Sequence, residues 1–89
     1  MKISAMLQTP AVKILLFLYE KQEVRYTDLT NLMTSRGTLS INLKELDQEG
    51  LIQRRVVTMK PIQSYYSLTE KGAKATEILK ELSKTLETP

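Results

Sequence analysis

The sequence predicts a mainly α-helical domain with one small β-hairpin, an α+β fold. Two observations predict it. Before Gly50 the apolar residues recur at spacings of three and four, which is the period of amphipathic helices. After Gly50 they alternate as in strands, until a helical pattern returns near residue 70. With 89 residues, 42% of them hydrophobic, the chain is expected to form a single domain over residues 1–89, with a core and hairpin at 9–69 and a C-terminal helix at 70–87.

The first helix is expected from Pro10 to about Lys21. Thr9 supplies a capping hydroxyl, and proline is favoured at the first helical position. The wide apolar surface of this helix predicts a central core element that can also contribute to a subunit contact. The next segment, Glu23–Tyr26, is β-tolerant and is expected to be extended. The apolar residues of the helix fall on two neighbouring faces, Ala11, Leu15 and Leu18 on one, and Val12, Leu16 and Tyr19 on the other.

A second, shorter helix is predicted to begin with Thr27 as its cap. Asp28 is then well placed in the first turn, where a negative charge is favourable. The helix is expected to end near Thr34, because Ser35 has the character of the next cap. Its buried stripe is predicted to be Leu29, Leu32 and Met33.

The third helix is predicted from about Arg36 to Gln48, and Gly50 is expected to end it in a left-handed conformation. Leu51 can then make the hydrophobic contact of a Schellman ending. A short helix and a longer one joined by a tight turn form a helix-turn-helix arrangement. The inward stripe of the longer helix is Leu39, Leu43 and Leu46.

A β-hairpin is expected after Gly50, with strands at Leu51–Thr58 and Ser64–Leu68. The segment Met59–Gln63 is predicted to be a loop, because Pro61 is poorly suited to a paired strand interior. A last helix follows, with Thr69 as its cap. Its apolar stripe has little left in the chain to cover it, so we expect a dimer interface there, with packing back on the chain's own core as the alternative. The predicted dimer interface is Ala75, Ile78, Leu79, Leu82 and Leu86.

The composition argues against several classes of function. The chain has no cysteine and no histidine, which excludes disulfides, thiol chemistry and metal sites built on those residues. It also shows no nucleophile–base pair and no glycine-rich phosphate loop, so we expect neither an enzyme nor a cofactor. The longest apolar run, Ile14–Tyr19, is too short to cross a bilayer, and the N-terminus is unlike a secretory signal. We therefore expect a cytoplasmic protein.

The charges are unevenly placed, although the net charge is only +3. No acidic residue lies between Asp28 and Glu45, or between Glu49 and Glu70. The two acid-free stretches indicate a polyanionic partner, while chance patterning on a solvated surface is the alternative. Their basic residues are Arg36 and Lys44 in the first stretch, and Arg54, Arg55 and Lys60 in the second.

Two motifs resemble the winged helix-turn-helix transcriptional regulators of the MarR, ArsR, PadR and HxlR families. Residues 35–52, SRGTLSINLKELDQEGLI, resemble their Ser-Arg-x-Thr-Leu-Ser, Leu-Lys-x-Leu and Gly-Leu-Ile pattern. Residues 66–72, YSLTEKG, resemble the Tyr-x-Leu-Thr-x-x-Gly that ends the wing, as the hairpin is called in these proteins. The order of elements is also theirs, and the resemblance covers nearly all of the chain after Thr9.

The HxlR type is the most similar of these families, because residues 25–29 (RYTDL) and Pro61 fit its pattern. The chain departs from it in lacking the usual cysteine near the N-terminus and a Gly-Lys-Trp before the first helix. The Asp-x-Arg of a MarR wing is also missing, and metal sensing of the ArsR kind is excluded without cysteine or histidine.

The resemblance implies a sequence-specific regulator that binds double-stranded DNA as a homodimer, with the third helix in the major groove and the wing on the minor groove or phosphates. In alternating strands Arg54 and Arg55 point to opposite sides, so one of them is expected to face DNA. The recognition-helix candidates are Ser35, Arg36, Gly37, Thr38, Ser40, Ile41, Asn42 and Lys44, and the wing candidates are Arg54, Arg55 and Lys60.

Other interpretations remain open at this point. Winged helices also serve as protein–protein interaction modules in larger assemblies, and basic wing residues also discourage edge-to-edge strand pairing. Tyr66 matches the core tyrosine of the wing motif and is expected to be structural. Tyr65 is left open, with base stacking as one role. An effector ligand between dimer helices is neither predicted nor excluded.

Overall fold

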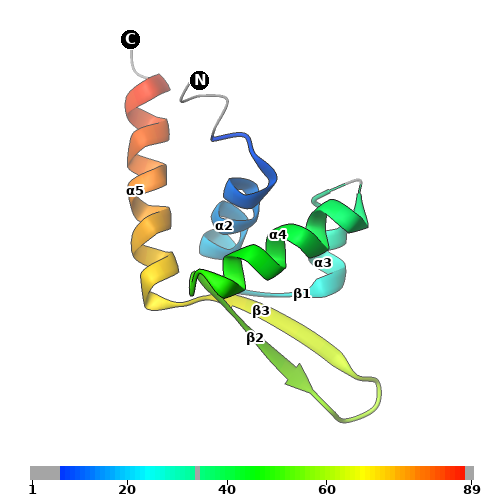
Figure 1. Ribbon diagram of the computed structural model, residues 1–89. Helices are drawn as coiled ribbons and strands as arrows, with labels where there is room; N and C mark the ends of the chain where they lie inside the picture. The colour runs from blue at the N-terminus through cyan, green and yellow to red at the C-terminus, as the bar shows by residue number, and fades with distance from the viewer. Residues whose placement is uncertain (1–6, 34, 88–89) are drawn as a thin grey trace.

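The computed structural model describes residues 7–33 and 35–87. Over these residues the chain forms four helices and a three-stranded antiparallel sheet (Figure 1). The predicted α+β class with a winged helix-turn-helix order is confirmed. The elements are α2 (Pro10–Lys21), β1 (Glu23–Arg25), α3 (Tyr26–Thr30), α4 (Arg36–Gln48), β2 (Ile52–Val57), β3 (Gln63–Leu68) and α5 (Glu70–Glu87).

The sheet has the strand order β1-β3-β2, so β3 is central. Its register places Val24 of β1 and Arg54 of β2 on either side of Tyr66, while Arg25 and Arg55 flank Tyr65. Because successive side chains on a strand alternate, the sheet has one face with Tyr66 and an outer face with Tyr65. The predicted extended segment is therefore a sheet strand, although its pairing with β3 was not predicted.

The core lies between α2, α4 and the inner face of the sheet. Ile14 and Leu18 of α2, Leu39 of α4 and Ile52 of β2 are each at most 2% exposed. The predicted inward stripe of α4 is confirmed, because its buried residues are Leu39, Leu43 and Leu46. Tyr66 is 9% exposed and belongs to the same core, which confirms its structural role.

The second helix differs from the prediction at both ends. It begins at Tyr26, not after Thr27, because the Asp28 carboxylate accepts a hydrogen bond from the backbone N–H of Arg25 at 3.0 Å. It ends at Thr30, whose hydroxyl donates to the Thr27 carbonyl at 2.6 Å and so competes with continued helix. Leu32 and Met33 lie beyond the helix, yet they are half-buried and pack on the core. The predicted end near Thr34 lies outside the described residues.

Helix α4 ends as predicted, in a Schellman motif. Gly50 has a φ of +74°, the left-handed region in which glycine is favoured. Its N–H donates to the Asp47 carbonyl at 3.0 Å, and the Leu51 N–H donates to the Leu46 carbonyl at 3.0 Å. The hairpin that follows projects away from the helices (Figure 1), and its second strand begins at Gln63, which had been assigned to the loop.

The start of α5 is bonded to the turn that ends α4. Three consecutive carbonyls of that turn accept hydrogen bonds: Glu49 from Lys71 Nζ at 2.8 Å, Gly50 from the Thr69 hydroxyl at 2.6 Å, and Leu51 from the Thr69 N–H at 3.1 Å. The Thr69 hydroxyl in turn accepts from the Gly72 N–H at 3.0 Å, which confirms Thr69 as the cap of this helix. We call the contact between residues 49–51 and 69–72 the α4–α5 junction.

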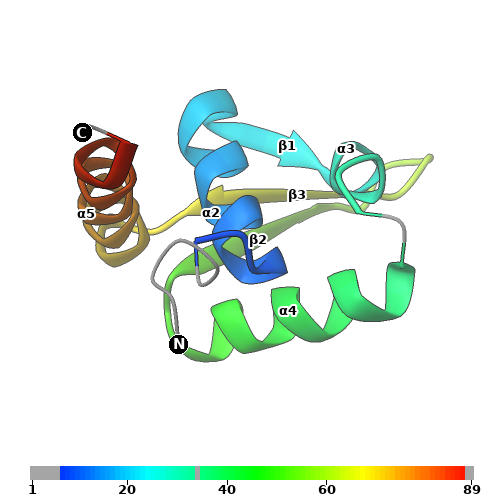
Figure 2. The same cartoon turned by 90° about the horizontal axis from the view of Figure 1, so that it is seen from above.

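Helix α5 packs on α2, and its fully buried positions lie outside the predicted apolar stripe, while Ala75, Leu79 and Leu82 of that stripe are half-buried. Its buried residues are Gly72 and Thr76, and the Thr76 hydroxyl donates a hydrogen bond to the Gly72 carbonyl at 2.7 Å. Of the predicted stripe, Leu79 packs on the chain's own core, whereas Ile78 is 66% exposed. Figures 1 and 2 show α5 at one end of the molecule and α3 at the other. The Tyr19 hydroxyl adds a bond across the helix pair, to Glu77 at 3.1 Å.

Candidate nucleic-acid interface

The outward face of α4 is polar and well exposed. Arg36, Gly37, Ser40 and Lys44 are all exposed, and Ile41 in their midst is 61% exposed. Leu39 and the two leucines after it hold the opposite face in the core. Figure 2 shows α4 along one side of the molecule, with its length free of other elements on that side. A straight helix held this way can enter a groove as a unit.

Three of the predicted recognition residues have partners within α4 itself. The Ser35 hydroxyl accepts the Thr38 N–H at 3.2 Å and so caps the helix. Asn42 is half-buried, and its side-chain amide donates to the Thr38 carbonyl at 2.8 Å. These contacts give Ser35 and Asn42 structural roles, and they leave the exposed side chains as the better candidates for contact with a ligand.

Arg54 lies on the same side of the hairpin as α4. It is opposite Tyr66 in the sheet and, with Ser40 and Lys44 of α4, lines a hollow of about 290 Å³. Asp47 also borders this hollow. Burial raises the pKa of the Tyr66 hydroxyl, and the positive charge of Arg54 opposes that shift. The hollow thus joins the exposed face of α4 to the inner face of the wing, with two basic side chains at its border.

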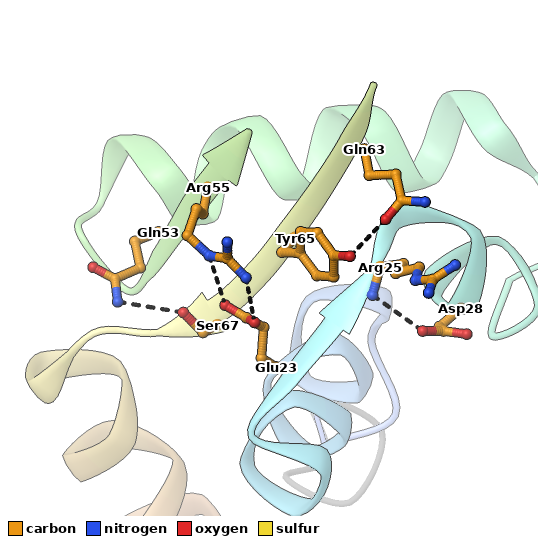
Figure 3. Close-up of polar contacts among 8 residues, drawn as sticks. All are labelled: Glu23, Arg25, Asp28, Gln53, Arg55, Gln63, Tyr65 and Ser67. Carbon is orange, nitrogen blue, oxygen red and sulfur yellow. Dashed lines mark hydrogen bonds and ion pairs between the residues drawn. The ribbon is translucent and has the colours of Figure 1, made fainter. Parts of the chain in front are cut away.

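Arg55 lies on the outer face of the sheet and is already paired (Figure 3). Its Nη2 is 2.8 Å from Oε1 of Glu23, and its Nε donates to Oε2 at 3.4 Å. The guanidinium carbon also lies 4.6 Å from the centre of the Tyr65 ring, a cation–π contact. The Arg55 hydrogen bond lowers the pKa of Glu23 below its ordinary value. The same bond raises the pKa of Arg55, which therefore stays charged.

Tyr65, whose role the sequence left open, is also engaged on this face. Its hydroxyl donates to Oε1 of Gln63 at 2.5 Å, and Arg55 covers its ring. These contacts account for Tyr65 without a stacked base. No sequence pattern points to Glu23, because its pairing with Arg55 depends on the register of three strands.

The tip of the wing carries Lys60, which is exposed as predicted. Two apolar side chains that we had not singled out lie beside it, Met59 at 77% exposed and Ile62 at 70% exposed. The only sequence signal for them is their presence next to Pro61 in a segment too irregular to pair.

Within residues 7–33 and 35–87, no group of three or more acidic side chains is arranged to hold a metal ion. None of the helices in this part of the chain has the length and hydrophobicity needed to cross a membrane.

Comparison with known proteins agrees with this arrangement. The family model described as HxlR-like helix-turn-helix matches residues 10–88, which include α4, the wing and α5. The chain belongs to the HxlR-like helix-turn-helix family. This confirms the resemblance inferred from the two sequence motifs and places the match over the same elements that form the candidate interface.

Proteins similar to this chain are named as regulators. The chain is 46% identical over 50 residues to the HTH-type transcriptional regulator YvaP of Bacillus subtilis (strain 168), covering 56% of this chain and 46% of the relative. It is 33% identical over 60 residues to the HTH-type transcriptional regulator YodB of the same organism, covering 65% of this chain and 54% of YodB. The chain thus spans about half the length of these two curated relatives.

Solved structures show the same fold. The crystal structure of diamide-treated YodB from B. subtilis superimposes with a TM-score of 0.74 at 26% identity, over 90% of this chain and 81% of YodB. A transcriptional regulator of the MarR family from Porphyromonas gingivalis W83 gives a TM-score of 0.69 at 28% identity, over 98% of this chain and 91% of the other. An HxlR-like chain is therefore similar in fold to MarR-type winged helices.

Proposed function

We propose that this HxlR-like chain is a cytoplasmic transcriptional regulator that binds double-stranded DNA in a sequence-specific manner. Helix α4 lies in the major groove as the recognition helix, and the wing (β2, β3 and the loop between them) contacts the minor groove or the phosphates. The family match and the relatives named as HTH-type transcriptional regulators support this function.

The observation that carries the proposal is the exposed face of α4. It presents two basic side chains and one exposed isoleucine, with no acidic residue between Arg36 and Lys44. Ile41, at 61% exposure, lies between these polar side chains on the same face. A face that meets a groove lined by phosphates and thymine methyl groups uses both features.

The exposed side chains have distinct chemical uses in a major groove. The Arg36 guanidinium can bind a guanine through two hydrogen bonds, and Ile41 can contact a thymine methyl group. Ser40 and Lys44 suit phosphate contacts. Gly37 lets the helix backbone approach a phosphate closely. Asn42 and Ser35, which are bonded within the helix, remain predicted contacts of lower rank.

On the wing, Arg54 and Lys60 are the proposed DNA contacts. Arg54 lies on the side of the hairpin that shares a hollow with α4, so it can reach the strand of DNA that α4 borders. Lys60 is at the tip, where a wing meets the minor groove or its phosphates. Arg55 is held on the outer face by Glu23, so its contribution is smaller.

We also propose that the chain acts as a homodimer through α5. The exposed part of the apolar stripe supports this, with Ile78 at 66% and Leu86 at 45% exposed. A two-fold dimer would place two recognition helices on successive major grooves, about 34 Å apart, to match a palindromic site. The proposed interface keeps the predicted residues Ala75, Ile78, Leu79, Leu82 and Leu86, with Leu79 divided between this surface and the chain's own core.

The test is selection of bound sequences from a pool of random duplexes, followed by a salt titration with the best duplex. We expect an enriched palindrome, and a linear fall of log affinity with log salt as counterions are released. A flat salt response together with no enriched sequence would contradict DNA binding.

Matched charge variants locate the interface. Lys44→Gln removes a positive charge from α4, and it should reduce the salt slope by about one. Lys74→Gln removes the same charge from the exposed side of α5, and it should leave the slope unchanged if α4 is the element that meets DNA. Equal effects of the two variants would show that the electrostatic attraction for DNA is not localised to α4.

A further inference from the structure

We propose that Glu23 limits the sequence-independent attraction of the wing for DNA by acting as an internal counter-ion to Arg55. It keeps one wing arginine from contributing to attraction for any duplex, and it leaves Arg54 as the arginine that faces DNA. This inference rests on the proposed DNA-binding function and adds a residue to it, because Glu23 lies in β1, outside both the recognition helix and the wing.

The pair spans the whole sheet. Arg55 is on the outer edge strand β2 and Glu23 on the opposite edge strand β1, with β3 between them. Arg55 is opposite Tyr65 in the register, and Glu23 is opposite Ser67, so the guanidinium reaches diagonally across β3 to the carboxylate. Figure 3 shows the two side chains meeting above the central strand.

Three contacts hold the Arg55 guanidinium in this position. Its Nη2 and Nε face the two carboxylate oxygens of Glu23, at 2.8 and 3.4 Å, in the forked geometry that arginine favours. Its carbon lies over the ring of Tyr65 at 4.6 Å. The ring is fixed by its own bond to Gln63 at 2.5 Å. To meet a phosphate, Arg55 would have to leave both the carboxylate and the ring.

Arg54, the preceding residue, has the opposite arrangement. It is exposed on the inner face, beside the hollow that Lys44 also lines. Among the residues described by the structure, Arg54 forms no ion pair with a carboxylate. The two neighbouring arginines of the wing therefore differ in free charge, and the difference comes from Glu23 alone.

The consequence for binding follows from counterion release. Each phosphate neutralised by a free cation adds about 0.9 to the slope of log affinity against log salt, whatever the DNA sequence. A cation already paired within the protein adds little to that sequence-independent attraction. By pairing Arg55, Glu23 therefore lowers the sequence-independent part of the affinity for DNA and the salt dependence that comes with it.

The experiment is a double-mutant cycle on binding to a random-sequence duplex, with salt slopes measured between 50 and 200 mM KCl. In the wild type, Arg55→Gln should change the slope little. In the Glu23→Gln background, Arg55→Gln should reduce the slope by about 0.9, which corresponds to about a threefold change in affinity across this salt range. Glu23→Gln alone should bind random duplex more tightly and with a steeper salt dependence than the wild type.

Glu20→Gln is the matched control, because it removes the same charge from an exposed glutamate on α2. Additive slopes in the cycle, or equal effects of Glu20→Gln and Glu23→Gln, would overturn this inference while leaving DNA binding in place. A wild-type chain that binds no duplex would instead overturn the proposed function and this inference with it.

Discussion

Gly72 lies so close to the backbone of Leu51 that a Cβ on it would be 1.8 Å from the Leu51 carbonyl oxygen. The same Cβ would be 2.8 Å from the carbonyl carbon, so backbone atoms rather than a flexible side chain stand in the way. Gly72→Ala must therefore push α5 away from the α4–α5 junction. We expect a loss of about 1–3 kcal/mol in the free energy of unfolding, as for other overpacked sites, measured by urea titration.

Gly37→Ala provides the control for that experiment. A Cβ at Gly37 has Ser35 Oγ at 3.8 Å as its nearest contact, which is an ordinary separation. Because alanine favours helix over glycine, we expect unchanged or increased stability, by up to about 0.5–1 kcal/mol. Equal losses for the two alanine variants would show that the close approach at Leu51 is not what Gly72 provides.

Gly50 tests the cost of backbone conformation and not of a steric clash, because a Cβ there meets nothing within 4 Å. Its φ of +74° is the whole obstacle to a side chain. Gly50→Ala should cost about 1–2 kcal/mol of stability, the usual penalty of the left-handed conformation. Gly50→Asn should cost less, since asparagine tolerates this region. Thermal or urea unfolding of the wild type and the two variants measures their order of stability. An alanine variant as stable as the asparagine variant would contradict this prediction.

The two faces of α4 should separate stability from binding. Leu39 is 0% exposed, so Leu39→Ala should cost about 2–5 kcal/mol in unfolding free energy. Ile41 is 61% exposed, so Ile41→Ala should change stability by less than about 0.5 kcal/mol. We expect Ile41→Ala to weaken binding to the selected duplex several-fold while random duplex is bound as before. An unchanged affinity for the selected duplex would remove Ile41 from the interface.

The Glu23–Arg55 pair gives a prediction for pH. Arg55 lowers the pKa of folded Glu23, so folding favours the ionised carboxylate. The pair's contribution to stability is present above the pKa of an unfolded glutamate, about 4.3, and is lost as pH falls through the lower pKa of the folded state. The stability difference between wild type and Glu23→Gln should therefore shrink between pH 7 and pH 3, and also in 1 M salt. A difference that grows on acidification would contradict the pairing.

The α5 surface predicts an effect on oligomeric state. Ile78→Glu places a charge on a side chain that is 66% exposed in the single chain, so folding should be retained. In a dimer joined through this surface the charge is buried, and sedimentation equilibrium should show a shift to monomer. Met59→Glu makes the same chemical change at a 77% exposed position on the wing and should leave the oligomeric state unchanged. A wild-type monomer at all concentrations would rule out the dimer.

The elements that the sequence predicted well are those specified by local contacts. Helix α4 was predicted with its bounds, because Ser35, a leucine stripe and Gly50 define its start, side and end within one segment. The ends of α3 were predicted wrongly, because two side-chain bonds to the backbone, from Asp28 and Thr30, decide them over longer-range periodicity.

What the sequence left out depends on distant segments. The pairing of β1 with β3 joins residues forty or more positions apart, and no local pattern in a three-residue strand specifies it. The fully buried positions of α5 are Gly72 and Thr76, a glycine and a polar residue that hydrophobic periodicity ignores. The candidate interface shows the same dependence on distant segments. The sequence identifies Arg54 and Arg55, but only the strand register shows that Arg55 is the one that pairs with Glu23.

The α4–α5 junction also bears on the half-site spacing that a dimer would bind in DNA. Three successive carbonyls at the end of α4 are bonded to the first residues of α5, and Gly72 allows direct contact of their backbones. These hydrogen bonds and the close backbone contact fix how the start of α5 lies against the turn that ends α4. In a dimer joined through α5, the crossing angle of the two α5 helices would set the separation of the two recognition helices. A change at the subunit boundary, far from any base, would then alter which half-site spacing the protein accepts.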